Sequence, residues 1–92
     1  MIHEIKIQKE FAHAVYIGGK TFEVRNNDRG YQKGDLISFK VMDGVLREPT
    51  HPLNDMTFEI TYVLGSFVGL APNYVAFAIR DVTEEMKGAD NE

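Results

Sequence analysis

Apolar and polar residues alternate in several short runs along this 92-residue chain, and such alternation predicts β-strands. Successive side chains of a strand point to opposite faces, so Ile5 and Ile7 are predicted on one face and Glu4 and Lys6 on the other. Runs of this kind predict five strands, over residues 2–7, 21–25, 36–42, 57–64 and 74–80. Short strands separated by turn formers predict a mostly β fold, a small and mainly antiparallel β-barrel.

The fourth and fifth predicted strands carry specific expectations about burial. The fourth has the cleanest alternation in the chain, which places Phe58, Ile60, Tyr62 and Leu64 together on one face and Val63 on the other. The fifth is nearly all apolar, and this composition predicts burial on both of its faces.

One or two short helices are expected beside the strands. The spacing of Phe11, Ala14 and Val15 predicts an early helix over residues 9–17. Gly18 follows directly and is suited to cap the helix, because glycine adopts left-handed backbone angles without steric strain.

The remaining segments are predicted as turns, loops and a tail around one domain. Residues 48–55 contain two prolines and are expected to form a surface loop whose length is free to vary. Residues 1–82 are predicted to form a single domain. Residues 83–92 form an acidic C-terminal tail, expected to fray or to make a short terminal helix.

Composition narrows the possible function classes. The chain is 43% hydrophobic and has no cysteine, which favours one compact core and excludes a disulfide framework or a cysteine nucleophile. His3, His13 and His51 do not have metal-ligand spacing, so neither a metal nor another cofactor is expected. No apolar run approaches the roughly 18 residues of a membrane span. A cytoplasmic protein without a membrane partner is therefore expected.

The net charge of −4 argues against a general nucleic-acid binder, but the charge is unevenly distributed. Acidic residues concentrate after residue 80, and most basic residues lie in the first half of the chain. Those in the first half are Lys6, Lys9, Lys20, Arg25, Arg29, Lys33 and Lys40. Long nucleic acids need many phosphate contacts. A short RNA strand or one nucleotide is therefore a better expectation, and nothing signals DNA. The oligomeric state is not predicted.

The strongest functional signal is the charged strand over residues 21–25. Phe22 and Val24 are predicted to face the core, with Glu23 and Arg25 on the opposite face and Lys20 at the entry. A carboxylate between two cations stays ionised and orients them toward a phosphate, a carboxylate or a base edge. The other interpretation is a solvated face with surface ion pairs, each worth about 0–1 kcal/mol.

A resemblance favours the first interpretation. Gly18, Lys20, Glu23 and Arg25 resemble the G-x-K-x-x-E-x-R signature of ASCH domains, the activating signal cointegrator homology family. The similarity covers roughly residues 2–80, and the residues on both sides of the signature resemble a small branch found in bacteria and phages. It implies a PUA-like β-barrel in which the signature strand lines a cleft. The cleft residues expected on this basis are Lys6, Lys20, Glu23, Arg25, Asp28, Arg29 and Tyr74.

The resemblance implies that this cleft binds RNA or a nucleotide-like ligand. The alternative is a small, metal-independent hydrolase that acts on RNA or on a modified nucleoside. In the amidohydrolase branch of the family a threonine stands three residues after the signature lysine, whereas here that position is Glu23. A ribonuclease could use Lys20, Glu23 and Arg25 as its catalytic groups, but a carboxylate between two cations is a poor general base. Binding is therefore expected ahead of catalysis.

The loop after the charged strand leaves two interpretations open. Arg29 and Tyr31 are suited to stack on an RNA base. Tyr31 is equally suited to fill the space under the loop as part of the core.

Overall fold

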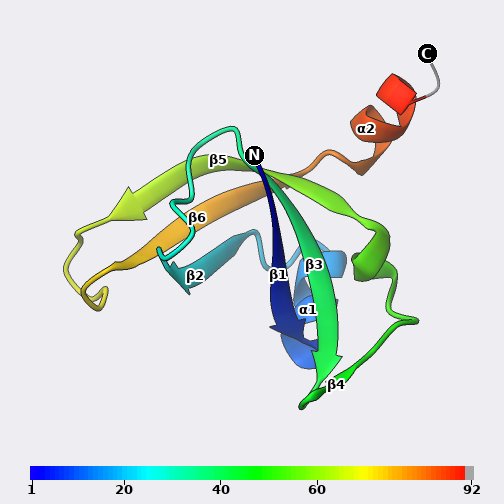
Figure 1. The fold of residues 1–92 in the computed structure, drawn as a ribbon, viewed down its shortest axis with the longest axis horizontal. Coiled ribbons are helices and arrows are strands. Elements are labelled where there is room, and N and C mark those ends of the chain that lie inside the picture. Colours follow the sequence, from blue (N-terminus) through cyan, green and yellow to red (C-terminus); the bar gives the residue numbers. More distant parts are fainter. Residues whose placement is uncertain (91–92) are drawn as a thin grey trace.

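The computed structural model describes residues 1–90, with side chains described through Lys87 (Figure 1). Short strands are the main regular elements of the chain. In chain order the elements are β1 (Ile2–Gln8), α1 (Lys9–Tyr16), β2 (Phe22–Asn26), β3 (Leu36–Asp43), β4 (Leu46–Arg47), the 3-10 helix η1 (Pro52–Asp55), β5 (Thr57–Gly65), β6 (Tyr74–Asp81) and α2 (Thr83–Asp90).

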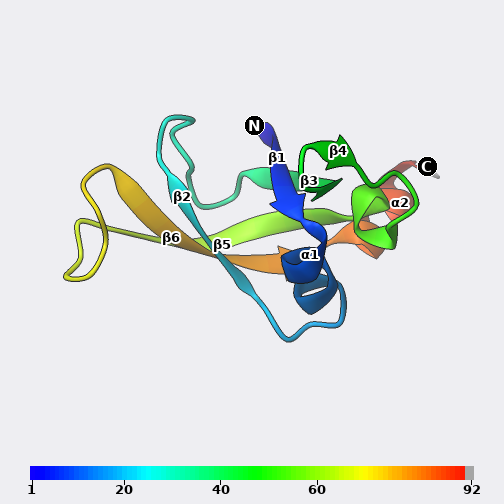
Figure 2. The same cartoon turned by 90° about the horizontal axis from the view of Figure 1, so that it is seen from below.

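The strands form one strongly curled sheet in the order β1-β3-β5-β6-β2, with β4 added beside β3. The β1–β3 pair is parallel and the other pairs are antiparallel. The curl turns the sheet into a half-barrel, with β1 and β2 at its two ends (Figures 1 and 2). The predicted mostly β, barrel-like fold with two short helices is therefore confirmed.

The core fills the concave side of the half-barrel. Alternate residues of β1 and β3 point inward, including Ile5, Ile37 and Phe39, and Phe77 of β6 meets them. Burying such a side chain contributes roughly 1.5–3 kcal/mol each. Helix α1 packs on β1, β3 and η1. It ends at Tyr16, and Gly18 two residues further on has a φ of 82°, which is the predicted left-handed cap.

The expected faces of β5 and β6 are partly wrong. A register shift between Ile60 and Tyr62 marks a β-bulge, which reverses the alternation beyond it. Val63 therefore packs on the core, whereas Tyr62 is 63% exposed and Leu64 shares its outward face. The outer face of β6 is not fully buried either, because its residues there, such as Ala76, are only half-covered.

The expected face of β2 is inverted. Phe22 and Val24 are 50% and 49% exposed on the outer face, whereas Glu23 is 2% exposed on the concave face. The charged side chains take the inner positions because cations on both sides of Glu23 compensate its burial. The charged row thus lies inside the half-barrel.

Residues 48–55 are anchored, so their expected freedom to vary in length is wrong. The side chain of Leu53 in η1 is completely buried among the strands. The side-chain amide of Asn54 accepts from the Val41 backbone N–H at 2.9 Å and donates to the carbonyls of Glu48 and His51. These bonds tie the segment to β3.

The C-terminal segment forms the short terminal helix α2, which packs against β5. Residues 91–92 of the predicted acidic tail lie outside the described residues. Within residues 1–90, no helix is long and apolar enough to cross a membrane.

Candidate functional site

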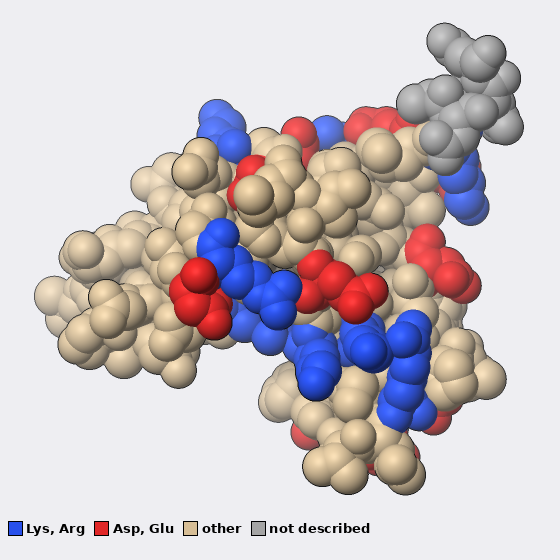
Figure 3. Space-filling model, viewed as in Figure 1, with Lys and Arg blue, Asp and Glu red and all other residues tan. Residues whose placement is uncertain are grey.

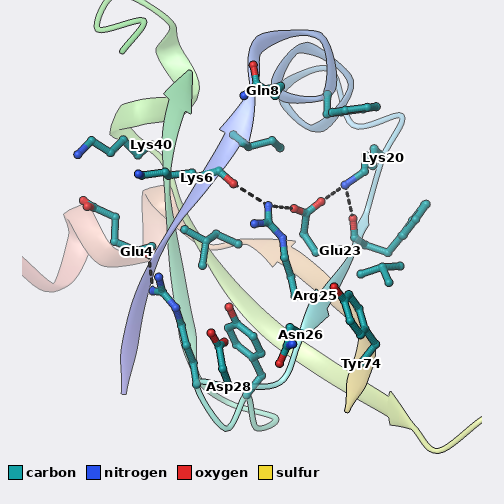
Figure 4. A pocket seen from close by; sticks show the side chains of 17 residues that line it. Glu4, Lys6, Gln8, Lys20, Glu23, Arg25, Asn26, Asp28, Lys40 and Tyr74 are labelled. Carbon is teal, nitrogen blue, oxygen red and sulfur yellow. Dashed lines mark hydrogen bonds and ion pairs between the residues drawn. The ribbon is translucent and has the colours of Figure 1, made fainter. Parts of the chain in front are cut away.

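A groove of about 850 Å³ opens between β1 and β2, the two end strands of the sheet (Figure 4). Its two sides are formed by residues Glu4–Gln8 of β1 and Phe22–Asn26 of β2. All the cleft residues expected from the sequence line it. They are Lys6, Lys20, Glu23, Arg25, Asp28, Arg29 and Tyr74. The structure therefore brings together residues that lie up to 68 positions apart in the chain.

Glu23 lies between two cations on the inner side of the groove. Its Oε1 accepts a hydrogen bond from Nη2 of Arg25 at 2.7 Å, and its Oε2 pairs with Nζ of Lys20 (Figure 4). Lys20 also donates to the carbonyl of Phe22 at 2.7 Å. Both carboxylate oxygens are thus engaged, and Glu23 holds the two cations in fixed positions.

Burial perturbs both cations of this cluster. The pKa of Lys20 is lowered, mainly by desolvation and further by repulsion from Arg25. Desolvation also lowers the pKa of Arg25, although the guanidinium remains charged at neutral pH. Desolvated cations are stabilised by a further negative charge, so an anion in the groove would offset the penalty of their burial.

Two arginine side chains cross the groove and close the half-barrel. Nη2 of Arg25 donates to the Lys6 carbonyl at 2.8 Å, and Nη1 of Arg29 donates to the Glu4 carbonyl at 2.5 Å. β1 pairs with β3 on its other side, so these carbonyls lie on an edge without a strand partner. A guanidinium has five N–H donors. Each arginine can therefore hold this edge and still bind a ligand.

Lys40 is a groove residue that sequence reasoning did not place in the cleft. It is the register partner of Lys6 on the parallel pair β1–β3, and the two side chains lie side by side (Figure 4). A pattern within one strand cannot show which residue of another strand lies opposite. Asn26 at the end of β2 is a second lining residue that was missed.

The groove is cationic although the chain as a whole is acidic. Lys and Arg side chains form a band across the face that carries β1 (Figure 3). The cations that line the groove are Lys6, Lys20, Arg25, Arg29 and Lys40, against the carboxylates of Glu4, Glu23 and Asp28. Not every basic residue of the first half converges, because Lys9 pairs with Asp43 and Lys33 does not line the groove.

Tyr31 belongs to the core. Of its two interpretations, the one in which it fills the space under the loop therefore holds. Its side chain is 5% exposed, and its ring lies 4.8 Å from the rings of both His3 and Phe77. Burial raises the pKa of its hydroxyl. Tyr31 therefore supports the loop that carries Arg29, and its ring is not accessible for stacking on a base.

His3 and Asp35 fasten the other end of that loop. Nε2 of His3 bonds Oδ2 of Asp35 at 2.8 Å, and the same oxygen accepts from the Gln32 backbone N–H at 3.1 Å. Asp35 thus caps its turn as predicted, and His3 is a packing residue as expected. The hydrogen bond from His3, followed by that from Gln32, lowers the pKa of the Asp35 carboxyl from its ordinary 3.8.

Asp35 is expected to make stability depend on pH in acid. Because its pKa is lower in the folded state than in the unfolded state, Asp35 stabilises the fold above its ordinary pKa, and this contribution is lost as the pH falls through the lowered value. Urea unfolding measured between about pH 5 and pH 2 should show a shallower pH dependence for Asp35→Asn than for the wild type. Identical slopes would contradict the role of this carboxylate.

No metal site is evident among residues 1–90, where no group of three or more His, Asp or Glu residues is placed to hold an ion. The polar groups of the groove are ammonium, guanidinium, carboxylate and amide groups. This set is suited to bind an anionic organic molecule by charge-assisted hydrogen bonds.

Comparisons with known proteins identify a family and a fold. A family model described as "Domain of unknown function (DUF3850)" matches residues 2–79. The crystal structure titled "hypothetical protein PH0355" superposes with a TM-score of 0.56 at 18% sequence identity, covering 88% of this chain and 99% of the other. At this identity the similarity shows the fold alone. No curated protein matches the chain.

Proposed function

The chain belongs to the family of domains of unknown function DUF3850, and we propose that its groove binds RNA or a nucleotide-like ligand through a phosphate group. The observation that carries the proposal is the Lys20–Glu23–Arg25 cluster. Its two cations are partly desolvated and held in place by one buried carboxylate. Preorganised cations of this kind bind phosphate strongly, and a guanidinium does so with two parallel hydrogen bonds.

The dimensions of the groove favour a small ligand or a short segment of a strand. Its volume of about 850 Å³ lies in the range of sites for small molecules and cofactors. A long duplex would need many more phosphate contacts, and the net charge of −4 would oppose it. One nucleotide, free or at an accessible position of an RNA strand, suits both the size and the charge.

We also assign the domain to the ASCH branch of PUA-like barrels. The assignment is supported by what the signature residues do. Gly18 caps helix α1 with a positive φ, and the other signature positions, Lys20, Glu23 and Arg25, meet in the groove. The spacing of the signature thus follows from the turn after α1, which contains Gly18, and from the inner face of β2, which carries Glu23 and Arg25.

Catalysis has less support than binding. A general base needs an available lone pair directed at the substrate, whereas each oxygen of Glu23 already contacts a cation. Hydrolysis of RNA or of a modified nucleoside therefore remains the alternative outcome of the binding test below.

Arg25→Gln is expected to weaken the binding of nucleoside 5′-monophosphates and of a single-stranded RNA hexamer about 10- to 100-fold, as the loss of one charge-assisted hydrogen bond predicts. Lys40→Gln should weaken binding several-fold, because it removes a cation from the groove. Isothermal titration calorimetry measures both effects. Affinity should also fall as salt concentration rises.

Arg47→Gln is the matched control, since Arg47 is an exposed arginine of β4 outside the groove. Equal affinities of Arg25→Gln, Lys40→Gln and Arg47→Gln for these ligands would contradict the proposal. Mass spectrometry of the same incubations, with EDTA present, would detect cleaved products. Products that disappear in Lys20→Ala would show a hydrolase instead.

A further inference from the structure

A second hollow of about 600 Å³ adjoins the groove. It lies between the turn that follows β2 and the loop of the β5–β6 hairpin, which projects away from the rest of the sheet (Figure 1). Asn26, Asp28 and Tyr74 line both spaces. Figure 4 shows these three at the end of the groove opposite Lys20. The two spaces therefore meet at these three residues.

The chemistry of the hollow differs from that of the groove. No lysine or arginine lines it, and its one carboxylate is Asp28, which the groove shares. Its polar groups are mainly side-chain amides and two hydroxyls, and its apolar surface includes two aromatic rings. These residues are Asn26, Asn27, Ser66, Phe67, Asn73 and Tyr74. Such a set suits an uncharged, planar ligand with donors and acceptors on its edge.

Several of these groups are available to a ligand. Among residues 1–87, whose side chains are described, no protein group bonds the side-chain amides of Asn26 or Asn73, and Phe67 is 59% exposed. The frame of the hollow is nevertheless fixed. The Asn27 N–H donates to the Asn73 carbonyl at 2.7 Å, and Oδ1 of Asn27 accepts from the Tyr31 N–H at 2.8 Å. The two walls are thus tied together through Asn27, while the side-chain amides of Asn26 and Asn73 remain unengaged by any described residue.

From this juxtaposition we propose that the second hollow is a nucleobase site, which takes the base of the nucleotide whose phosphate lies in the groove. An aromatic ring stacks on a base, and an asparagine amide pairs with its polar edge through one donor and one acceptor. Arg25 lines the groove and Asn26, the next residue of β2, lines both spaces, so the phosphate site and the base site meet at the end of this strand. The inference rests on the proposed function and adds the base as a recognised group.

Ribose 5-phosphate and the four nucleoside 5′-monophosphates are the probes that separate the two sites. With the wild type, at least one monophosphate should bind ten-fold or more tightly than ribose 5-phosphate. Phe67→Ala should weaken the binding of that monophosphate about 5- to 150-fold, as the loss of one stacked base predicts. The affinity for ribose 5-phosphate should stay unchanged. Asn26→Ala should act in the same direction and change which base is preferred.

Val68→Ala is the matched control, because Val68 is 93% exposed in the same loop and does not line the hollow. It should change neither affinity. Asn73 is left intact, because its φ of 66° would strain an alanine. Equal binding of all the probes, unaffected by Phe67→Ala, would overturn the base site and leave the phosphate site standing. Failure of every probe to bind the wild type would overturn both proposals.

Discussion

Glu23→Ala is expected to lower the free energy of unfolding by about 3 kcal/mol, because it leaves two partly buried cations facing each other without a carboxylate. Removing one partner of a buried ion pair costs roughly 3–5 kcal/mol. The lower end applies here, since Lys20 and Arg25 retain some access to solvent. Urea denaturation at neutral pH measures the loss.

Glu59→Ala is the control for this prediction. Glu59 also pairs with an arginine of a neighbouring strand, Arg80, at 3.0 Å, but that pair is on the exposed face of the sheet. Its removal should change stability far less, because exposed ion pairs contribute little. Equal losses for the two variants would contradict the stabilising role of the buried Glu23 carboxylate. Glu23→Gln, which keeps the shape but removes the charge, should fall between Glu23→Ala and the wild type.

Leu53→Ala is expected to lower the free energy of unfolding by about 2–5 kcal/mol, the range for a fully buried leucine that leaves a cavity. Leu53 lies in η1, in a segment that its prolines mark as a loop, and its side chain reaches the core between α1 and β3. Thermal and urea unfolding both measure the change.

Val45→Ala tests the specificity of that effect, because Val45 lies in another turn and is 92% exposed. It should leave stability almost unchanged. If Leu53→Ala were equally mild, the segment would not be anchored and its length could vary, as the sequence alone predicts.

Stability and binding are linked in the groove through Arg25. The same guanidinium contacts Glu23, holds the β1 edge at the Lys6 carbonyl and faces the space proposed for phosphate. Every binding measurement on an Arg25 variant therefore needs a stability measurement beside it. The Lys40→Gln variant changes only packing and charge in the groove. It therefore isolates the electrostatic contribution to ligand binding.

The sequence by itself determined most of the elements and seven residues that line the candidate site. Alternation and turn formers are local signals, and they located five of the strands, the first helix and the glycine that caps it. The signature from Gly18 to Arg25 and the turn that follows it contain five of the expected cleft residues. They are Lys20, Glu23, Arg25, Asp28 and Arg29, and all five line the groove.

Only the tertiary structure decided which way these elements face. Alternation along β2 puts Phe22 and Glu23 on opposite faces, but it does not show which of these faces is buried. Which residue points inward depends on where the cations lie. The bulge after Ile60 reverses the faces of β5 through one extra residue that no local pattern marks. The pairing of Lys6 with Lys40 depends on the register of a parallel pair 34 residues apart. These features arise from long-range packing, because burial and charge compensation are properties of the neighbours that the folded chain brings together.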